Sequence, residues 1–322
     1  MKHMRTVPLL QSQLGIYLQC RRLRGTAYNQ HWLYTLDDAV DPDRLAAAID
    51  RVMAFYPSLN TRLRKRDGKP VQYIPEKEDP YRQQVENLSE DEWEREKAVL
   101  VSQPMELFDS RLICFHVVRT ERAKYLFQSA HHILFDGRAM QILVDAISTA
   151  YAGSELRTEQ KTVLDAATAE TEERQSGTYQ KAREWYERHF SGIDAESMPL
   201  PDRGKKDDFK AFTRILPVQE KEITAFCHGK GYSTSALTSG AFAIAMGIYT
   251  NRQEALFSTI WNGRNEELAG SFGMFVKTLP VYAVWNRDTR TTDFLSDLTE
   301  TIRESRENST FSYGEVKVST AN

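Results

Sequence analysis

Apolar residues recur with helical spacing in several parts of the 322-residue chain. The clearest stripe lies in residues 41–55, where Ile49 and Val52 share one face and Asp41 or Asp43 can cap the N-terminus. This pattern predicts an amphipathic helix. Further helices are expected over residues 86–101, 138–152, 179–190, 220–228 and 294–306.

Strands are predicted where apolar and β-branched residues cluster between turn signals. Residues 111–118 and 124–130 are both β-prone and are joined by a short polar link, which indicates a hairpin. The Asp67-Gly68 pair, ahead of Tyr73, indicates a second hairpin. Other strands are expected over residues 212–216, 255–261 and 274–285.

Residues 153–177 are polar, acidic and nearly without large apolar side chains. We interpret this segment as the crossing between two lobes, residues 1–176 and residues 177–322. The chain is long enough for two packed lobes. Because strands and helices are mixed in irregular order, the fold class is predicted to be α/β or α+β.

Residues 231–251 contain no charged side chain, and the length is close to that of a membrane-spanning helix. However, the segment is rich in serine, threonine and glycine. It therefore predicts a buried helix of a soluble core, over residues 236–249, and no membrane partner.

The net charge of −3 gives no electrostatic reason to expect nucleic acid or an anionic membrane as a partner. The three cysteines lie far apart and show no metal-ligand spacing. Reduced thiols and the absence of a signal-peptide core favour a cytoplasmic location. No metal site is predicted, because no second cluster of histidine and acidic residues has suitable spacing.

The candidate chemistry lies at residues 131–137. His131 and His132 end a predicted strand, while Asp136 and Gly137 begin a helix. Adjacent strand residues point to opposite faces, so one imidazole should pack inside while the other faces a cleft. Asp136 can cap the helix or pair with an arginine, and Gly137 permits close backbone approach or a positive φ. By composition alone, a structural histidine pair is the commoner interpretation.

The pattern H-H-x-x-x-D-G at these positions resembles the signature of the acyltransferase superfamily that includes chloramphenicol acetyltransferase-like enzymes and peptide synthetase condensation domains. Residues 12–18 and 56–61 resemble the first two condensation motifs. Residues 272–280, after Asn262-Gly263-Arg264, are close to the condensation signature G-x-F-V-N-T-L-P. The chain is therefore identified, over almost its whole length, as similar to non-ribosomal peptide synthetase condensation domains.

This resemblance implies a two-lobed chloramphenicol acetyltransferase-like fold, each lobe a mixed sheet flanked by helices, with the second lobe incomplete. It implies amide formation between a donor acyl or peptidyl thioester and an acceptor aminoacyl thioester. Donor and acceptor peptidyl carrier proteins would deliver these on phosphopantetheine, beside adjacent synthetase domains, with no cofactor bound by the chain itself.

His132 would lie in a tunnel and either accept the amine proton or position the amine. His131, Asp136 and Gly137 would mainly shape the loop. The resemblance also suggests three tunnel-lining residues: Trp261, Asn262 and Thr278.

Departures from the family pattern leave alternatives open. Asn60 stands where the family usually has arginine, and Lys277 where it has asparagine. The usual arginine partner of Asp136 belongs to a final motif with no counterpart in the chain. One alternative is an acyl-CoA-dependent O- or N-acyltransferase of the same superfamily. The other is a non-catalytic fragment that binds carrier proteins.

Overall fold

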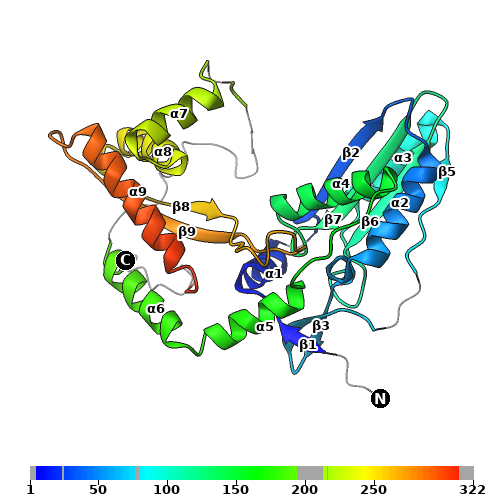
Figure 1. Ribbon diagram of the computed structural model, residues 1–322, viewed down its shortest axis with the longest axis horizontal. Helices are drawn as coiled ribbons and strands as arrows, with labels where there is room; N and C mark the ends of the chain where they lie inside the picture. Colours follow the sequence, from blue (N-terminus) through cyan, green and yellow to red (C-terminus); the bar gives the residue numbers. More distant parts are fainter. Residues whose placement is uncertain (1–4, 24, 77–79, 194–212, 216, 312–322) are drawn as a thin grey trace. The chain divides into compact units, whose positions relative to one another are not determined.

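The computed structural model describes residues 5–23, 25–76, 80–193, 213–215 and 217–311 (Figure 1). The chain divides into two compact units, residues 1–172 with 262–276, and residues 173–261 with 277–322. The chain therefore leaves the first unit, returns to it for a short segment, and leaves again. Each unit is described by itself.

The first unit contains strands and helices in mixed order. Its strands are β1 (Thr6–Pro8), β2 (Asn29–Leu36), β3 (Arg62–Arg66), β4 (Lys69–Tyr73), β5 (Val85–Asn87), β6 (Ile113–Arg119) and β7 (Lys124–His131). Its helices are α1 (Gln11–Leu23), α2 (Pro42–Phe55), the short 3₁₀ helix η1 (Pro57–Asn60), α3 (Glu90–Ser102), α4 (Gly137–Tyr151) and α5 (Val163–Glu173).

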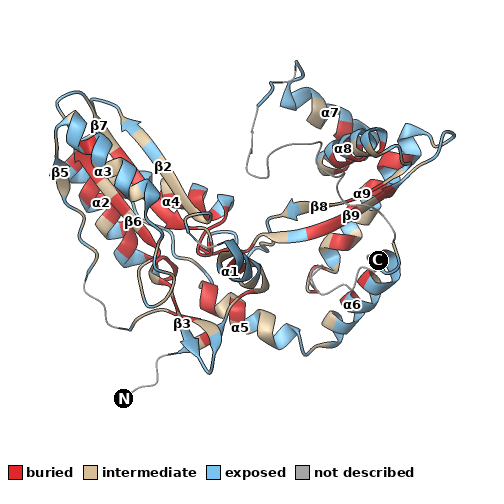
Figure 2. Ribbon diagram, turned by 180° about the vertical axis from the view of Figure 1, so that it is seen from behind, coloured by how far each residue is buried: buried red, intermediate tan, exposed pale blue. Residues whose placement is uncertain are grey.

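The larger sheet of this unit has the strand order β2-β7-β6-β5. Only β5 and β6 run parallel, and the predicted hairpin is the antiparallel β6–β7 pair. Side chains alternate along β7: Leu126 and Ala130 join the core formed with α2 and α4, whereas Phe127 packs with Trp93 of α3. The buried stripes of α2 and α4 appear in Figure 2. The sheet is thus covered on both faces.

The predicted amphipathic helix of residues 41–55 is confirmed as α2. Asp41 is its N-cap, and its carboxylate accepts a hydrogen bond from the Asp43 backbone N–H at 2.9 Å. Ile49 is fully buried and Val52 nearly so. The second predicted hairpin is β3–β4, whose turn has positive φ at both Asp67 and Gly68.

In the first unit one predicted helix begins later than expected, and one helix was not predicted. The helix predicted over residues 86–101 begins at Glu90, because Ser89 caps it and residues 85–87 form β5 instead. The polar segment 153–177 contains α5, which buries Val163, Leu164 and Ala167. So few apolar residues give a weak periodic signal, although they suffice to dock one helical turn.

The second unit contains α6 (Gly177–Phe190), α7 (Glu220–Lys230), α8 (Thr234–Thr250), β8 (Glu254–Trp261), β9 (Lys277–Val284) and α9 (Thr291–Glu307). Strands β8 and β9 form an antiparallel pair. Val281, Phe294 and Leu298 belong to a core shared by these strands, α8 and α9. Most of the strand predicted over residues 212–216 lies outside the described residues, and residues 213–215 have no regular structure.

The helix predicted over residues 236–249 is present as α8, but it is buried on one face only. Helix α8 buries only a narrow face of small residues, among them Gly240 and Gly247. Its opposite face carries Phe242, Ile248 and Tyr249, all more than half exposed. No helix in the described ranges is both long and apolar enough to cross a membrane. The expected mixed α/β class is confirmed for both units.

Candidate functional site

The H-H-x-x-x-D-G motif lies where β7 passes through a short turn into α4. His131 is the last residue of β7, and Asp136 is the N-cap of α4. His131 is buried and only 5% exposed, whereas His132 is partly exposed. This difference matches the opposite orientations that strand alternation predicts for neighbouring residues.

His132 is held in one tautomer by the turn that follows it. Its Nδ1 lies 2.7 Å from the carbonyl oxygen of Phe135. Because a carbonyl oxygen can only accept, Nδ1 must carry a proton, so in the neutral imidazole Nε2 keeps its lone pair. The His132 backbone N–H donates to the Tyr28 carbonyl at 2.8 Å, which fixes the residue on β2's side of the turn. The imidazole is therefore prepared to accept a proton at Nε2.

The contacts of His131 hold the turn in place. Its Nδ1 accepts a hydrogen bond from the Ile133 backbone N–H at 3.1 Å, and its Nε2 lies 3.7 Å from Cys20 Sγ of α1. Burial, together with the neighbouring His132, lowers the pKa of His131 to about 4. The residue is thus neutral near pH 7 and connects the turn to α1.

Asp136 makes both interactions that its sequence position allowed. Its Oδ1 accepts from the Ala139 backbone N–H at 2.8 Å and so caps α4. Its Oδ2 accepts from Arg264 Nη1 at 2.5 Å and from the Phe275 backbone N–H at 2.9 Å. The side chains of Arg264 and Asp136 are 3% and 0% exposed. The motif carboxylate is therefore a buried, fully partnered anion.

The arginine partner of Asp136, which the sequence left open because the final family motif has no counterpart here, is Arg264. Arg264 also donates through Nη2 to the carbonyl oxygens of Ser271 and Gly273, at 3.4 and 3.3 Å. Its guanidinium lies 4.7 Å from the Phe275 ring centroid. Arg264 thus links the 262–276 segment to the turn. The Asn262-Gly263-Arg264 motif was the available signal, but sequence spacing could not show which carboxylate it would meet.

The remaining predicted residues are placed differently. Gly137 has neither a positive φ nor an atom within 4 Å of the position a Cβ would occupy, so neither conformational role expected for it is observed. Asn262 accepts from the Arg264 backbone N–H at 3.1 Å and belongs to the first unit. Trp261 ends β8 and Thr278 lies in β9, both in the second unit.

The two departures from the family pattern both have local partners. Asn60 donates to the Met53 carbonyl at 2.9 Å and accepts from Arg111 at 2.8 Å, so it links η1 to α2 and to the start of β6. Lys277 donates to the Ser309 carbonyl at 2.7 Å within the second unit. Both substitutions are accommodated by hydrogen bonds.

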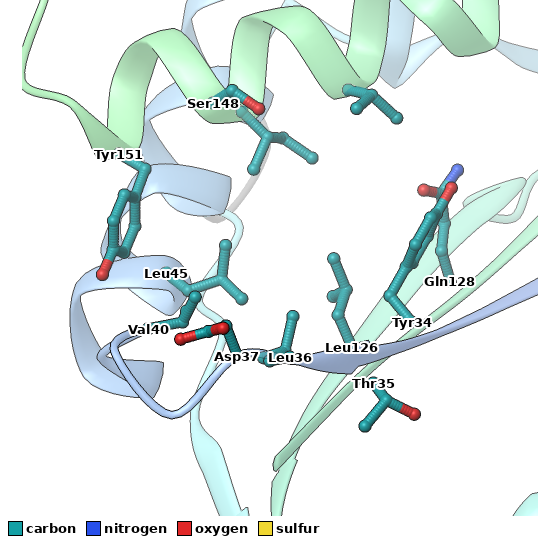
Figure 3. A pocket seen from close by; sticks show the side chains of 12 residues that line it. Tyr34, Thr35, Leu36, Asp37, Val40, Leu45, Leu126, Gln128, Ser148 and Tyr151 are labelled. Carbon is teal, nitrogen blue, oxygen red and sulfur yellow. The ribbon is translucent and has the colours of Figure 1, made fainter.

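A separate cavity of about 380 Å³ lies in the first unit between α4, the strands β2 and β7, and the loop after β2 (Figure 3). Apolar side chains such as Leu36 and Leu126 line most of it, with the Tyr34 and Tyr151 rings facing it. No residue of the histidine motif lines this cavity.

The mixed α/β fold, with the H-H-x-x-x-D-G turn leading into α4, is the chloramphenicol acetyltransferase-like fold of solved condensation domains. The family model described as "Condensation domain" matches residues 3–322. The chain belongs to the condensation domain family.

Similar proteins include multi-domain synthetases. Tyrocidine synthase 3 from Brevibacillus parabrevis is 27% identical over 264 residues, covering 79% of this chain and 4% of that protein. Gramicidin S synthase 2 from Brevibacillus brevis is 25% identical over 299 residues, covering 88% of this chain and 6% of that protein. The chain therefore spans only a small part of the length of the curated relatives that it matches.

Solved structures show the same fold at low identity. The X-domain solved in complex with OxyB from teicoplanin biosynthesis matches with a TM-score of 0.81 and 19% identity, over 100% of this chain and 75% of that chain. The first condensation domain of the calcium-dependent antibiotic synthetase, in complex with a substrate analogue, matches with a TM-score of 0.75 and 16% identity, over 97% and 77%.

Proposed function

We propose that the chain joins a donor acyl or peptidyl thioester to an acceptor aminoacyl thioester through an amide bond. Each substrate would be carried on the phosphopantetheine arm of a peptidyl carrier protein within a synthetase. The match to the condensation family over residues 3–322 supports the reaction class. The observation that carries the proposal is the 2.7 Å contact of His132 Nδ1 with the Phe135 carbonyl, which leaves Nε2 as the acceptor.

In the proposed reaction the acceptor amine attacks the carbonyl carbon of the donor thioester. The new C–N bond forms, the C–S bond breaks, and the thiolate of the donor phosphopantetheine leaves. The amine must lose one proton, which His132 Nε2 accepts and then returns to the departing sulfur. His132 can also hold the amine in the attacking position, so part of the rate would come from alignment of the two tethered substrates.

The other motif residues would position His132. Asp136, paired with Arg264, fixes the first turn of α4 and therefore the turn that contains the Phe135 carbonyl. His131 stays neutral and connects the turn to α1. We retain Trp261, Asn262 and Thr278 as proposed substrate-contacting residues, each to be tested by substitution. The proposal includes no cofactor held by the chain itself.

The test is amide formation with a panel of donor- and acceptor-loaded carrier proteins. His132→Ala should lower the rate of product formation by about 10²-fold or more if the imidazole acts as a base. His228→Ala, at an exposed histidine of α7, is the matched control and should leave the rate unchanged. Product formed equally fast by His132→Ala would overturn the role assigned to His132.

A non-catalytic binding role is the second candidate. The observation that favours it is the likeness to an X-domain that was solved in complex with OxyB. Carrier-protein binding measured by calorimetry, with no product from any donor and acceptor pair, would support this role over catalysis. Product from acyl-CoA without a donor carrier protein would instead indicate a free-standing acyltransferase.

A further inference from the structure

A second group of polar side chains gathers on the α3 side of the larger sheet in the first unit. Glu86 comes from β5, Glu96 from α3 and His116 from β6. One potential ligand atom of each lies within 4.8 Å of those of the other two. The three residues are far apart in sequence, and only the packing of α3 beside β5 and β6 brings them together. The sequence-based expectation of no metal site considered local spacing alone.

The donors in this cluster are chemically mixed. His116 Nδ1 lies 2.9 Å from Glu86 Oε1, and these side chains are 20% and 29% exposed. Cys114 is two residues from His116 on β6, so its side chain points to the same face. Its thiol is close enough to the imidazole to interact with it electrostatically. The group therefore offers nitrogen, oxygen and sulfur ligands from three separate elements.

The charges of the cluster do not balance. Glu86 pairs with His116, but Glu96 makes no hydrogen bond or ion pair with any residue that the structure describes. Two half-buried carboxylates thus share one imidazole. Like charges this close repel each other, and burial weakens the screening that water would provide. A bound dication would offset this repulsion.

We propose that Glu86, Glu96 and His116 bind one divalent transition metal ion of the zinc type, with Cys114 as the neighbouring fourth donor. Imidazole and thiolate ligands favour zinc, cobalt or nickel, whereas magnesium and calcium favour oxygen ligands alone. Ligand distances of about 2.0–2.3 Å would require the side chains to close around the ion by small rotations. The ion would tie α3 to β5 and β6, on the opposite side of the sheet from α4.

The experiment titrates the untagged, metal-free full chain with Zn²⁺, and with Co²⁺ followed by absorption. We expect one equivalent to bind and to raise the Tm. His116→Gln and Glu96→Gln should each weaken binding by about ten-fold or more. Loss of the cobalt–thiolate absorption in Cys114→Ser would assign the fourth donor.

Glu94→Gln is the matched control, because Glu94 lies on the same helix but pairs with Lys97 at 2.6 Å outside the cluster. This variant should bind metal as the unchanged chain does. The proposal is overturned if Zn²⁺ and Co²⁺ leave the Tm and spectra unchanged. It is equally overturned if His116→Gln and Glu96→Gln bind as tightly as Glu94→Gln, since binding would then be elsewhere on the surface.

Discussion

At the scale of single residues, the carboxylate of Asp136 connects the histidine motif to a segment more than a hundred residues later in the chain. It is fully buried and is shared by Arg264, the Phe275 backbone N–H and the N-terminus of α4. A buried charge with this many partners is stable only while all of them remain. Removal of one partner therefore tests the arrangement.

Arg264→Met should lower the free energy of unfolding by about 3–5 kcal/mol, because it leaves Asp136 charged, buried and without its cation. Urea unfolding followed by tryptophan fluorescence measures the change. The double variant Arg264→Met with Asp136→Asn should recover part of the loss, since no unpaired charge then remains. Equal losses in the single and double variants would show that packing of the arginine, and not its charge, is what matters.

Protonation of His131 should contribute to the pH dependence of the free energy of unfolding. Its pKa is about 4 in the folded chain, against about 6.5 in an unfolded chain, so the folded state binds the proton less strongly. The resulting stability is present above pH 6.5 and is lost as the pH falls towards 4, to an extent of up to about 3 kcal/mol.

His131→Gln cannot take up this proton, so its free energy of unfolding should fall less steeply between pH 6.5 and 4. Urea midpoints measured across that range provide the comparison. His228→Gln, at an exposed position, serves as the control and should keep the slope of the unchanged chain. An unaltered slope in His131→Gln would mean that other groups account for the acid sensitivity.

Residue identity allowed the motif itself to be found, but the tautomer and the partners required the fold. The alternation rule separated His131 from His132 correctly in burial. It could not show that Phe135 would accept from His132 Nδ1, because that contact depends on the path of the turn. Nor could it pair Asp136 with Arg264, since long-range pairing leaves no periodic signal in one sequence.

At the scale of elements, two glycines within helices have opposite surroundings. A Cβ at Gly247 of α8 would lie 2.3 Å from the Trp285 ring and 2.7 Å from the Arg252 carbonyl oxygen. A Cβ at Gly15 of α1 would have no atom within 4 Å, and the residue is exposed. The same substitution should therefore have opposite effects at the two positions.

Gly15→Ala should raise the free energy of unfolding by about 0.5–1 kcal/mol, because alanine loses less backbone entropy in a helix. Gly247→Ala should lower the stability of the second unit, by about 1–3 kcal/mol, because the methyl group displaces Trp285 or the backbone. Thermal unfolding followed by circular dichroism measures both. A stabilised Gly247→Ala would contradict the close packing of α8 on Trp285.

Element prediction succeeded where the periodic signal was long. The stripe of α2 and the β6–β7 hairpin are both present as predicted. It missed α5, whose apolar face is too short to show a period, and it overstated the burial of α8, because a lack of charge does not by itself imply burial. The small residues on one face of α8 predict its buried side better than the lack of charge does, because they mark the face that approaches other elements closely.

At the scale of the whole molecule, each of the two compact units is formed by two separate stretches of the sequence. Residues 262–276 are far in sequence from 1–172 yet belong to the same unit. Within it, Phe272 is 1% exposed and contacts the Tyr56 ring at 4.8 Å between centroids. The Phe272 backbone N–H also donates to the partly buried carboxylate of Glu159, at 3.4 Å. A compositional boundary in sequence cannot reveal such a return of the chain.

A fragment of residues 1–172 should consequently be destabilised, because it lacks Arg264 and leaves the sites of Phe272 and Phe275 empty. Burial of the two rings alone contributes about 3–6 kcal/mol. A synthetic peptide of residues 262–276 should bind the fragment and raise its Tm, as measured by calorimetry and circular dichroism.

The same peptide carrying both Phe272→Ser and Phe275→Ser should bind at least about ten-fold more weakly. Each substitution removes a buried ring that contributes more than about 1.4 kcal/mol, the free energy that corresponds to a ten-fold change in affinity. If the fragment is as stable alone as with the peptide, residues 262–276 do not contribute to the stability of the first unit. Its hold on Asp136 would then contribute to the motif turn without being needed for the fold around it.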